Sequence, residues 1–547
     1  MNIACHLIEQ SQERPYQCAI VFPEGRDANG RVAYTQLTFK QLNEESDRFA
    51  QGFVSFGIGR GCRTVLMVRP SLEFFSLTFA LFKAGAVPVM IDPGMGRARL
   101  LECIRDVEPE ALIGVPQAHL ARILFPKYFR TVKRFVTVGR RWFWSGATLD
   151  DVREKEWRPF PLAETRADET AAILFTTGST GPAKGVVYEH GMFDAQIRWI
   201  QSRYGIEGGE SDLPAFPLFA LFSCAMGMTC VIPDMDPTRP ARVDPRKIVE
   251  AIENHGCTNA FGSPAIWNRV SQYCVEKGVR LPTLRRVLMA GAPVSPEILE
   301  RMRRALGPGA DCHTPYGATE ALPVATISGS EVLDETAALS RRGAGTCVGR
   351  PFDGIDLRIV RITDDPIERW DNSLVVPQGE IGEIVVKGNV VTKEYFNKPA
   401  HTRLAKIPDG ADIWHRMGDA GYLDGKGRLW FCGRKDHRVV CGDRTLFSVP
   451  CEAIFNQHPD VFRSALVGVG PRGRQRPVII IEPREGKMPP DPASRERFIA
   501  ELLKLSASND LTKDITVVLF HPAFPTDIRH NAKIFRERLA VWAAGRI

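Results

Sequence analysis

The chain has 547 residues, of which 44% are hydrophobic and 25% charged, which is ordinary usage for a folded protein. At roughly 100–200 residues per domain, this length predicts more than one folding unit. The composition excludes a disordered protein, a collagen-like repeat and a disulfide-stapled miniprotein. The formal net charge of +7, from 71 basic and 64 acidic side chains, is too weak to indicate nucleic-acid binding, although it suits an anionic substrate.

The lack of a recognisable secretory signal and the spacing of the cysteines both predict a reducing compartment. Residues 1–22 lack a basic start followed by an apolar stretch, so we expect no secretory signal. The most apolar run, residues 74–92, contains Lys83 and falls short of an uninterrupted membrane span. The 13 cysteines form no C-x-x-C pair, which predicts reduced thiols in a cytoplasmic protein.

Short strands and helices alternate through the first four hundred residues. Residues 64–68 are typical of a buried strand, Ser71 is a candidate N-cap for the helix that follows, and residues 87–91 predict the next strand. Similar units recur at 257–262 and 286–290. Alternation at this spacing predicts parallel sheets.

The pattern of predicted strands and helices changes twice in the second half of the chain. Residues 348–395 contain short strands separated by glycines, which predicts a β-rich subdomain. Beyond the charged segment 434–436, strands at 464–469 and 477–482 and a helix at 495–505 predict a small α/β unit.

These patterns together predict an α/β protein with two domains. We expect a large N-terminal domain over residues 1–433, with parallel-rich sheets and the β-rich subdomain. A hinge is expected over 434–437, followed by a small mobile C-terminal α/β domain over 438–547.

Residues 175–186, FTTGSTGPAKGV, form the most informative segment. A strand that runs into a loop rich in Gly, Ser and Thr can wrap phosphate oxygens with N–H and hydroxyl donors, and Lys184 adds a positive charge. The loop is not a Walker A motif, because Gly185 follows Lys184, and it lacks the G-x-S-x-G spacing of a hydrolase nucleophile. A surface turn is the alternative, but the density of donors favours a phosphate site.

Three further clusters lie downstream, at 291–293 (GAP), 316–320 (YGATE) and 418–422 (GDAGY). Each alone is weak, because glycine-rich turns with an acid are common in loops. Together with the phosphate loop they supply a ring to stack on a base, a carboxylate for a metal and a carboxylate for ribose hydroxyls. That combination predicts a nucleotide site.

In this order and spacing, the segments resemble the acyl-adenylate-forming (AMP-binding) superfamily, which includes acyl-CoA synthetases and firefly luciferases. The resemblance spans roughly residues 20–540 and includes GRKDHRVVCGDR at the expected hinge. It implies ATP and Mg²⁺ as cofactors, with Glu320 as the metal ligand. The catalytic residues implied in this way are Lys533, Lys184, Glu320 and Thr319.

The same resemblance implies the nucleotide-binding set and the pivot. Asp419 would accept from the ribose hydroxyls, and Asp436 would be the hinge residue. At Lys533 the sequence departs from the family pattern, because Asn531 and Ala532 stand where glycine usually precedes the lysine. The nucleotide-binding residues are Thr176, Thr177, Gly178, Ser179, Thr180, Gly181, Gly291, Ala292, Pro293, Tyr316, Gly317, Ala318, Asp419, Arg434 and Arg444.

The sequence says less about which nucleophile accepts the acyl group and about the acyl pocket. Family acyl-CoA synthetases commonly carry P-L-F-H, whereas this chain has Ala220 at the histidine position. The apolar residues Phe219, Ala220, Phe222 and Met226 predict a pocket for a long acyl chain, with core packing as an equal alternative. His190, His313 and His530 are candidate bases for a substrate hydroxyl.

Within the superfamily, the chain is most similar to the olefin β-lactone synthetases of bacterial long-chain hydrocarbon biosynthesis. The resemblance rests on RHNAKIFR near the C-terminus and PLFALFS in place of PLFH. It implies adenylation of a long-chain 2-alkyl-3-hydroxy acid and attack of the 3-hydroxyl on the acyl carbon to give a β-lactone. The alternatives are a long-chain fatty acyl-CoA ligase and a non-catalytic adenylate-binding protein.

Aromatic and basic residues alternate between Phe125 and Trp144. This density suits a membrane surface or a partner protein, such as other enzymes of a hydrocarbon pathway. The alternative is a solvated loop whose aromatic rings fold back onto the domain.

Overall fold

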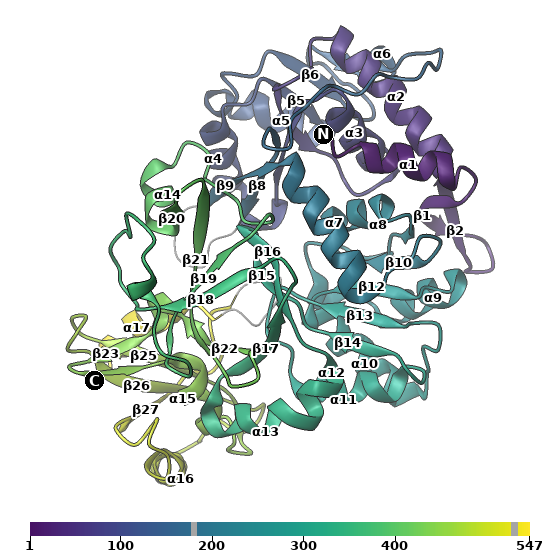
Figure 1. Cartoon of the computed structure of the whole chain (residues 1–547). Helices are drawn as coiled ribbons and strands as arrows, with labels where there is room; N and C mark the ends of the chain where they lie inside the picture. The colour runs from purple at the N-terminus through teal and green to yellow at the C-terminus, as the bar shows by residue number, and fades with distance from the viewer. Residues whose placement is uncertain (177–182, 527–533) are drawn as a thin grey trace.

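The computed structural model describes residues 1–176, 183–526 and 534–547. In these ranges three large sheets form most of the molecule, and a smaller sheet belongs to the C-terminal part (Figure 1). Among the same residues, no helix combines the length and the apolar character needed to cross a bilayer. The phosphate loop from Thr177 to Gly181 and the segment with His530 and Lys533 lie outside the described residues.

The first sheet is parallel except at the β1–β2 edge, and helices α9, α10 and α11 pack against one of its faces. Its strands, in sheet order, are β14 (Asp311–His313), β13 (Arg286–Met289), β12 (Asn259–Gly262), β10 (Ser211–Pro214), β11 (Thr229–Val231), β1 (Cys18–Arg26) and β2 (Val32–Thr38). The three helices are α9 (Pro245–His255), α10 (Pro264–Lys277) and α11 (Pro296–Ala305).

The second sheet follows the same plan: its strand pairs are parallel except for the antiparallel pair β8–β9 at one edge. Its strands are β7 (Ala147–Thr148), β6 (Arg134–Thr137), β5 (Ala111–Gly114), β3 (Arg63–Met67), β4 (Val87–Ile91), β8 (Thr170–Thr176) and β9 (Lys184–Glu189). The associated helices are α2 (Phe39–Ser55), α4 (Arg97–Val107), α5 (Pro116–Leu124) and α6 (Leu149–Val152).

Helix α3 (Leu72–Lys83) explains the most apolar run of the sequence. It lies in the hydrophobic core shared by the two sheets, together with α1 (Cys5–Glu13), α7 (His190–Tyr204) and α8 (Pro217–Ala225). Ser71 caps its first turn, as predicted, by accepting from the N–H of Phe74 at 3.4 Å. Lys83 ends the helix fully buried, 2.5 Å from Asp47, and burial lowers its pKa to about 8. A helix that is apolar all round is therefore a core helix here.

The β-rich subdomain predicted from the glycine-punctuated segment is an antiparallel sheet. Its strands are β15 (Tyr316–Ala318), β16 (Ala321–Thr326), β17 (Thr346–Pro351), β22 (Leu429–Arg434), β21 (Asp412–Leu423), β19 (Gly382–Lys387) and β18 (Asp356–Val360), with β20 (Lys406–Asp409) paired to β21. Short helices α12 (Gly329–Glu331), α13 (Ala337–Leu339) and α14 (Pro399–Ala405) connect them.

The C-terminal part has its own core between a small mixed sheet and its helices. The predicted strands and helix are present there. The elements are β23 (Val439–Cys441), β24 (Arg444–Leu446), α15 (Ser448–Phe455), β25 (Val461–Val469), β26 (Arg476–Pro483), α16 (Pro492–Ala507), β27 (Val517–Phe520) and α17 (Arg536–Ala544). The expected α/β class is confirmed, while the division of the chain into two moving units stays a prediction.

Candidate functional site

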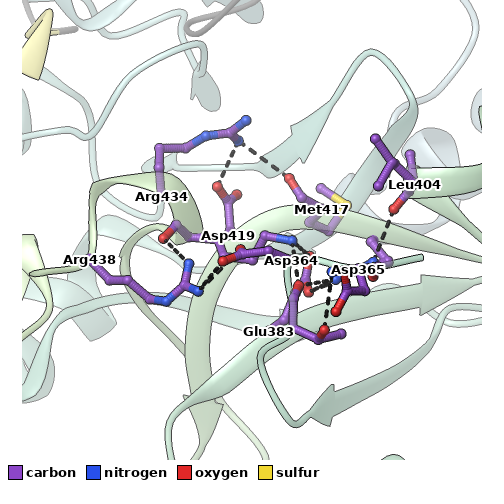
Figure 2. A network of polar contacts seen from close by, with 12 residues as sticks. Asp364, Asp365, Glu383, Leu404, Met417, Asp419, Arg434 and Arg438 are labelled. Atoms are coloured by element: carbon purple, nitrogen blue, oxygen red, sulfur yellow. Dashed lines mark hydrogen bonds and ion pairs between the residues drawn. The ribbon is translucent and has the colours of Figure 1, made fainter. Parts of the chain in front are cut away.

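A buried carboxylate joins side chains from three strands of the β-rich subdomain, β15, β21 and β22. Asp419 on β21 is 5% exposed and faces Arg434 at the end of β22 in the strand register. It accepts from the hydroxyl of Tyr316 at 2.5 Å. It also accepts from Nη1 of Arg434 at 2.7 Å (Figure 2). The nearby Asp419 charge raises the pKa of Arg434, while burial and the same carboxylate raise the pKa of Tyr316. The structure thus brings three of the predicted nucleotide residues together.

Glu320, the predicted metal ligand, stands in the turn between β15 and β16. One oxygen of its carboxylate, Oε1, accepts from the hydroxyl of Tyr395 at 2.8 Å. Nζ of Lys184 lies 4.8 Å from the centre of the Tyr395 ring, and burial lowers the pKa of Lys184 while Glu320 opposes that shift. Tyr395 therefore links the predicted metal ligand to the lysine of the predicted phosphate loop.

Tyr395 is a site residue that sequence reasoning missed. Its segment pairs with β9: the N–H of Phe396 donates to Gly185 at 2.8 Å, and Tyr395 forms an isolated bridge with Val186. The sequence gives only an indirect signal for Tyr395, because a tyrosine that follows Lys and Glu does not belong to a motif with a defined spacing. Only the pairing with the strand after the phosphate loop reveals its place.

The turn that carries Thr319 and Glu320 is also held by its backbone. The carbonyl of Thr319 accepts from the buried Tyr188 hydroxyl at 2.6 Å. The carbonyl of Glu320 accepts from both the N–H and the hydroxyl of Thr392, at 2.9 and 3.0 Å. Space is also tight at Gly317, where a Cβ would come within 2.8 Å of the carbonyl oxygen of Ala321. The turn therefore holds its polar side chains in a defined position.

Other predicted residues lie at the ends of strands or shortly after them. Thr176 ends β8 and pairs in register with Lys184. Gly291 follows the carboxyl end of β13 with a φ of +93°, a conformation that favours glycine, and Ala292 and Pro293 continue that turn. Ala318 ends β15, two residues before Glu320.

Arg444, by contrast, is engaged within the C-terminal part. It pairs with the Asp514 carboxylate and donates to the carbonyl of Asp510. The structure does not bring it into the Tyr316–Asp419–Arg434 cluster. Its predicted contact with the nucleotide therefore requires another arrangement of the C-terminal part.

Asp436, the predicted hinge residue, is exposed between two anchored cations. Before it, Nζ of Lys435 lies 3.1 Å from the fully buried Glu383. After it, Arg438 pairs with Asp364 at 2.9 Å (Figure 2). Both flanks of Asp436 are thus bound to the β-rich subdomain.

At the predicted acyl pocket, helix α8 presents two different faces. Ala220 and Met226 are 0% and 4% exposed and belong to the hydrophobic core, so for them the core-packing alternative describes the contacts. Phe219 and Phe222 are only half-buried. The helix thus leaves an apolar wall partly open.

Half-buried rings continue from that wall to the buried ring of Tyr188 beside the Thr319 turn. Ring centres are separated by 4.1 Å for Phe261–Phe219, 6.0 Å for Phe219–Phe222, 6.1 Å for Phe222–Phe193 and 4.9 Å for Phe193–Tyr188. We call these five rings the aromatic row. Because Tyr188 donates to Thr319, the row ends at the polar cluster.

Two candidate bases have structural roles. His190 is 1% exposed, accepts from the N–H of Ile3 at 3.2 Å, and has its pKa lowered to about 4 by burial. His313 has its pKa lowered by burial and packs edge-on against Tyr204. Both rings are neutral near pH 7, and both are engaged by neighbouring residues.

The donor set at Glu320 suits Mg²⁺ held largely by a substrate. In the described ranges, no group of three or more His, Cys, Asp or Glu side chains is arranged to hold a metal ion. Mg²⁺ is commonly bound by one or two carboxylates together with substrate phosphates and water. A single carboxylate with a free oxygen beside Lys184 fits that pattern.

Comparison with known proteins places the chain in a family. The AMP-binding enzyme family matches residues 7–396. The olefin beta-lactone synthetase of Xanthomonas campestris pv. campestris is 48% identical over 550 residues, covering 99% of this chain and 97% of that protein. The olefin beta-lactone synthetase of Stenotrophomonas maltophilia is 48% identical over 554 residues, covering 100% and 98%.

The fold has a counterpart among solved structures. The amide bond synthetase McbA of Marinactinospora thermotolerans superposes with a TM-score of 0.79 at 22% identity, covering 99% of each chain. At that identity the likeness concerns the fold alone. The chain therefore belongs to the AMP-binding enzyme family, and within it shares nearly half of its residues with olefin β-lactone synthetases.

Proposed function

We propose that this enzyme adenylates a long-chain 2-alkyl-3-hydroxy fatty acid with ATP and then closes it to a β-lactone, releasing diphosphate and AMP. The observation that carries this proposal is the 48% identity to olefin β-lactone synthetases over almost the whole chain. ATP and Mg²⁺ are the cofactors. The family of enzymes to which the chain belongs argues against a purely scaffolding role.

In the first half-reaction a carboxylate oxygen attacks the α-phosphorus of ATP, and the bond to the bridging oxygen breaks as diphosphate leaves. Two anions approach each other, so catalysis depends on in-line placement and on nearby positive charge. Lys184 and Lys533 supply that charge from the protein, and Glu320 would hold Mg²⁺, which would supply further positive charge to the phosphate oxygens. Thr319 lies at the α-phosphate.

The nucleotide is held by the groups around this centre. Asp419 binds the ribose hydroxyls, supported by its contacts with Tyr316 and Arg434. The loop 176–181 wraps the triphosphate, and the turns at 291–293 and 316–318 flank the adenine. Arg444 joins them when the C-terminal part, residues 438–547, turns about Asp436 relative to residues 1–433.

In the second half-reaction the substrate's own 3-hydroxyl oxygen attacks the acyl carbon. The C–O bond to AMP breaks, AMP leaves with the electron pair, and the hydroxyl proton passes to a base or to solvent. The nucleophile is tethered, so ring closure gains from effective concentration, although the four-membered ring is strained. No thiol acceptor is required.

The acyl chain lies against the open face of α8. Phe219 and Phe222 provide its apolar wall, with Ala220 and Met226 forming the core layer behind them. The position of this wall within the aromatic row supports the assignment, because the row leads to the Thr319 turn, where the carboxylate must react.

Three further points belong to this proposal. We place the reaction in the cytoplasm, where ATP is available, and all 13 cysteines are free thiols in accord with that. We expect assembly with other enzymes of the hydrocarbon pathway, because the product is apolar and reactive. Nucleic acid is not a partner.

The experiment compares a 3-hydroxy acid with the matched acid that lacks the 3-hydroxyl, each with ATP and Mg²⁺, with and without coenzyme A. The hydroxy acid should give AMP and β-lactone in equal amounts, with or without coenzyme A. The deoxy acid should release about one equivalent of diphosphate and then stall, because its acyl-AMP has no internal nucleophile.

An acyl-CoA ligase would show the opposite pattern. The deoxy acid would turn over freely once coenzyme A is added, and no lactone would form. That result would replace the lactone synthetase by the fatty acyl-CoA ligase as the function of this chain.

A further inference from the structure

One surface of the second sheet's domain gathers large apolar side chains in solvent. Ile123 and Leu124 at the end of α5 are 42% and 62% exposed. Trp142 and Phe143, in the loop after β6, are 54% and 74% exposed. We call these four residues the apolar patch. Monomeric proteins seldom expose several large side chains of this kind together without a binding role.

Two of the patch residues line a common hollow beside a buried tryptophan. Ile123 and Phe143 line one shallow hollow of about 410 Å³ together with Trp144. Trp144 is only 6% exposed, stacks on His119 at 5.6 Å and donates its indole N–H to Thr137 at 3.1 Å. Part of the predicted aromatic segment thus folds back onto the domain.

The exposed rings are supported by that buried indole. The ring centres of Trp142 and Phe143 lie 5.3 and 5.4 Å from that of Trp144. Two neighbouring tryptophans in the sequence therefore have different roles: Trp144 anchors the loop, and Trp142 faces solvent. This division argues against a flexible loop that exposes its rings by chance.

Basic side chains flank the apolar patch residues along the sequence. The exposed cations of the same segments are Lys127, Arg130, Lys133, Arg140 and Arg141. Arg141 has a carboxylate neighbour, Asp151, at 3.9 Å. An apolar centre bordered by lysine and arginine is complementary to a bilayer surface with anionic headgroups, where rings enter the interface and cations meet phosphates.

We propose that this surface docks the protein on anionic lipid bilayers. Trp142, Phe143, Ile123 and Leu124 enter the headgroup region, and the flanking cations bind lipid phosphates. In Figure 1 the elements α5, β5 and β6 lie at the top, whereas the C-terminal elements β25, β26, β27 and α16 lie at the bottom. Docking at the patch therefore leaves the C-terminal part free in the aqueous phase.

The test is co-sedimentation of the full chain with phosphatidylcholine vesicles that contain or lack phosphatidylglycerol. Wild type should bind the anionic vesicles, and less tightly as salt is raised. The double variant Trp142→Ser/Phe143→Ser and the triple variant Lys127→Gln/Arg130→Gln/Arg140→Gln should each lose affinity by about tenfold or more.

Matched controls separate the patch from general surface effects. Tyr16 is 82% exposed elsewhere on the molecule, and Tyr16→Ser should bind vesicles as wild type does. The triple variant Arg158→Gln/Lys277→Gln/Arg497→Gln removes the same charge from other exposed positions. An unchanged thermal midpoint in every variant shows that the fold is intact.

Three results would overturn the proposal. The first is absence of wild-type binding to anionic vesicles, and the second is equal binding by wild type and both patch variants. In the third, the wild-type chain is a dimer in lipid-free solution and Trp142→Ser/Phe143→Ser makes it monomeric. The patch would then be an interface between protein copies.

Discussion

At the proposed nucleotide end of the candidate site, polar and charged side chains meet through hydrogen bonds, whereas at the proposed acyl end aromatic rings pack against one another. Among the described residues, the carboxylate of Asp419 accepts from Tyr316 and Arg434, and that of Glu320 accepts from Tyr395, at 2.5 to 2.8 Å. Phe219 and Phe222 are held by packing, which has no preferred direction. Hydrogen bonds weaken steeply when their distance or angle departs from the preferred values. Substitutions at the polar end should therefore be tolerated far less well than substitutions at the acyl end.

The largest effect is expected at Lys533. Lys533→Ala should slow diphosphate release by about 100-fold or more while ATP still binds, because the charge matters most as the two anions meet. Lys513→Ala, which removes a half-exposed lysine paired with Asp510, is the control. A release rate within about threefold of wild type would remove Lys533 from the chemistry.

The next effect is expected at Asp419. Asp419→Asn keeps the shape but loses the charge that faces Arg434, so the apparent ATP KM should rise by about 10- to 100-fold. Asp409→Asn breaks a more exposed pair with Lys387 at 2.9 Å and should leave the KM for ATP alone. An unaltered ATP KM in Asp419→Asn would argue against ribose binding.

Tyr395→Phe removes one oxygen atom and tests whether the Tyr395 hydroxyl supports Glu320, the predicted metal ligand. Without the hydroxyl that donates to Glu320, the Mg²⁺ concentration for half-maximal activity should rise by about tenfold. Tyr422→Phe removes a comparable hydroxyl, which donates to the carbonyl of Ala344 at 2.9 Å, and should not change the Mg²⁺ requirement. Equal Mg²⁺ curves for Tyr395→Phe and wild type would assign Tyr395 to the fold alone.

At the acyl end the response should be smaller and of another kind. Phe222→Ala should favour longer or more branched acids, changing ratios of kcat/KM by about threefold to tenfold, with the ATP KM unchanged. Phe462→Ala, at a residue 52% exposed in the C-terminal part, is the control. A rise in the ATP KM of Phe222→Ala would mean that the two ends are not independent.

The smallest effect on catalysis is expected at His190, whose influence is on stability. Burial lowers its pKa from 6.5 to about 4, so the folded chain binds this proton less readily than the unfolded chain. The stabilisation is complete above pH 6.5 and falls by about 3 kcal/mol as the pH drops toward 4. Urea unfolding at pH 7 and 4.5 should show this loss in wild type and a smaller one in His190→Gln. Equal losses in both would disprove the assignment.

Local patterns in the sequence predicted most of the fold. Residues 87–91 form β4 with the predicted bounds, and Ser71 caps α3, because strand hydrophobicity and helix capping depend on near neighbours. The Tyr395–Glu320 hydrogen bond joins positions 75 residues apart, so it depends on how β9 pairs with a distant segment. Trp142 and Trp144 look alike in the sequence, yet only Trp144 finds an acceptor on Thr137.

The two anchors around Asp436 differ in how strongly solvent reaches them. Glu383, the partner of Lys435, is 0% exposed, whereas Asp364, the partner of Arg438, is 48% exposed. In the proposed rotation we expect the more exposed Arg438–Asp364 pair to break and the buried Lys435–Glu383 pair to stay. The pivot would then begin after Lys435. Salt shortens the range of surface charges to about 8 Å at physiological ionic strength. We therefore expect higher ionic strength to weaken the Arg438–Asp364 pair more than the buried Lys435–Glu383 pair, and so to favour the proposed change of position of the C-terminal part.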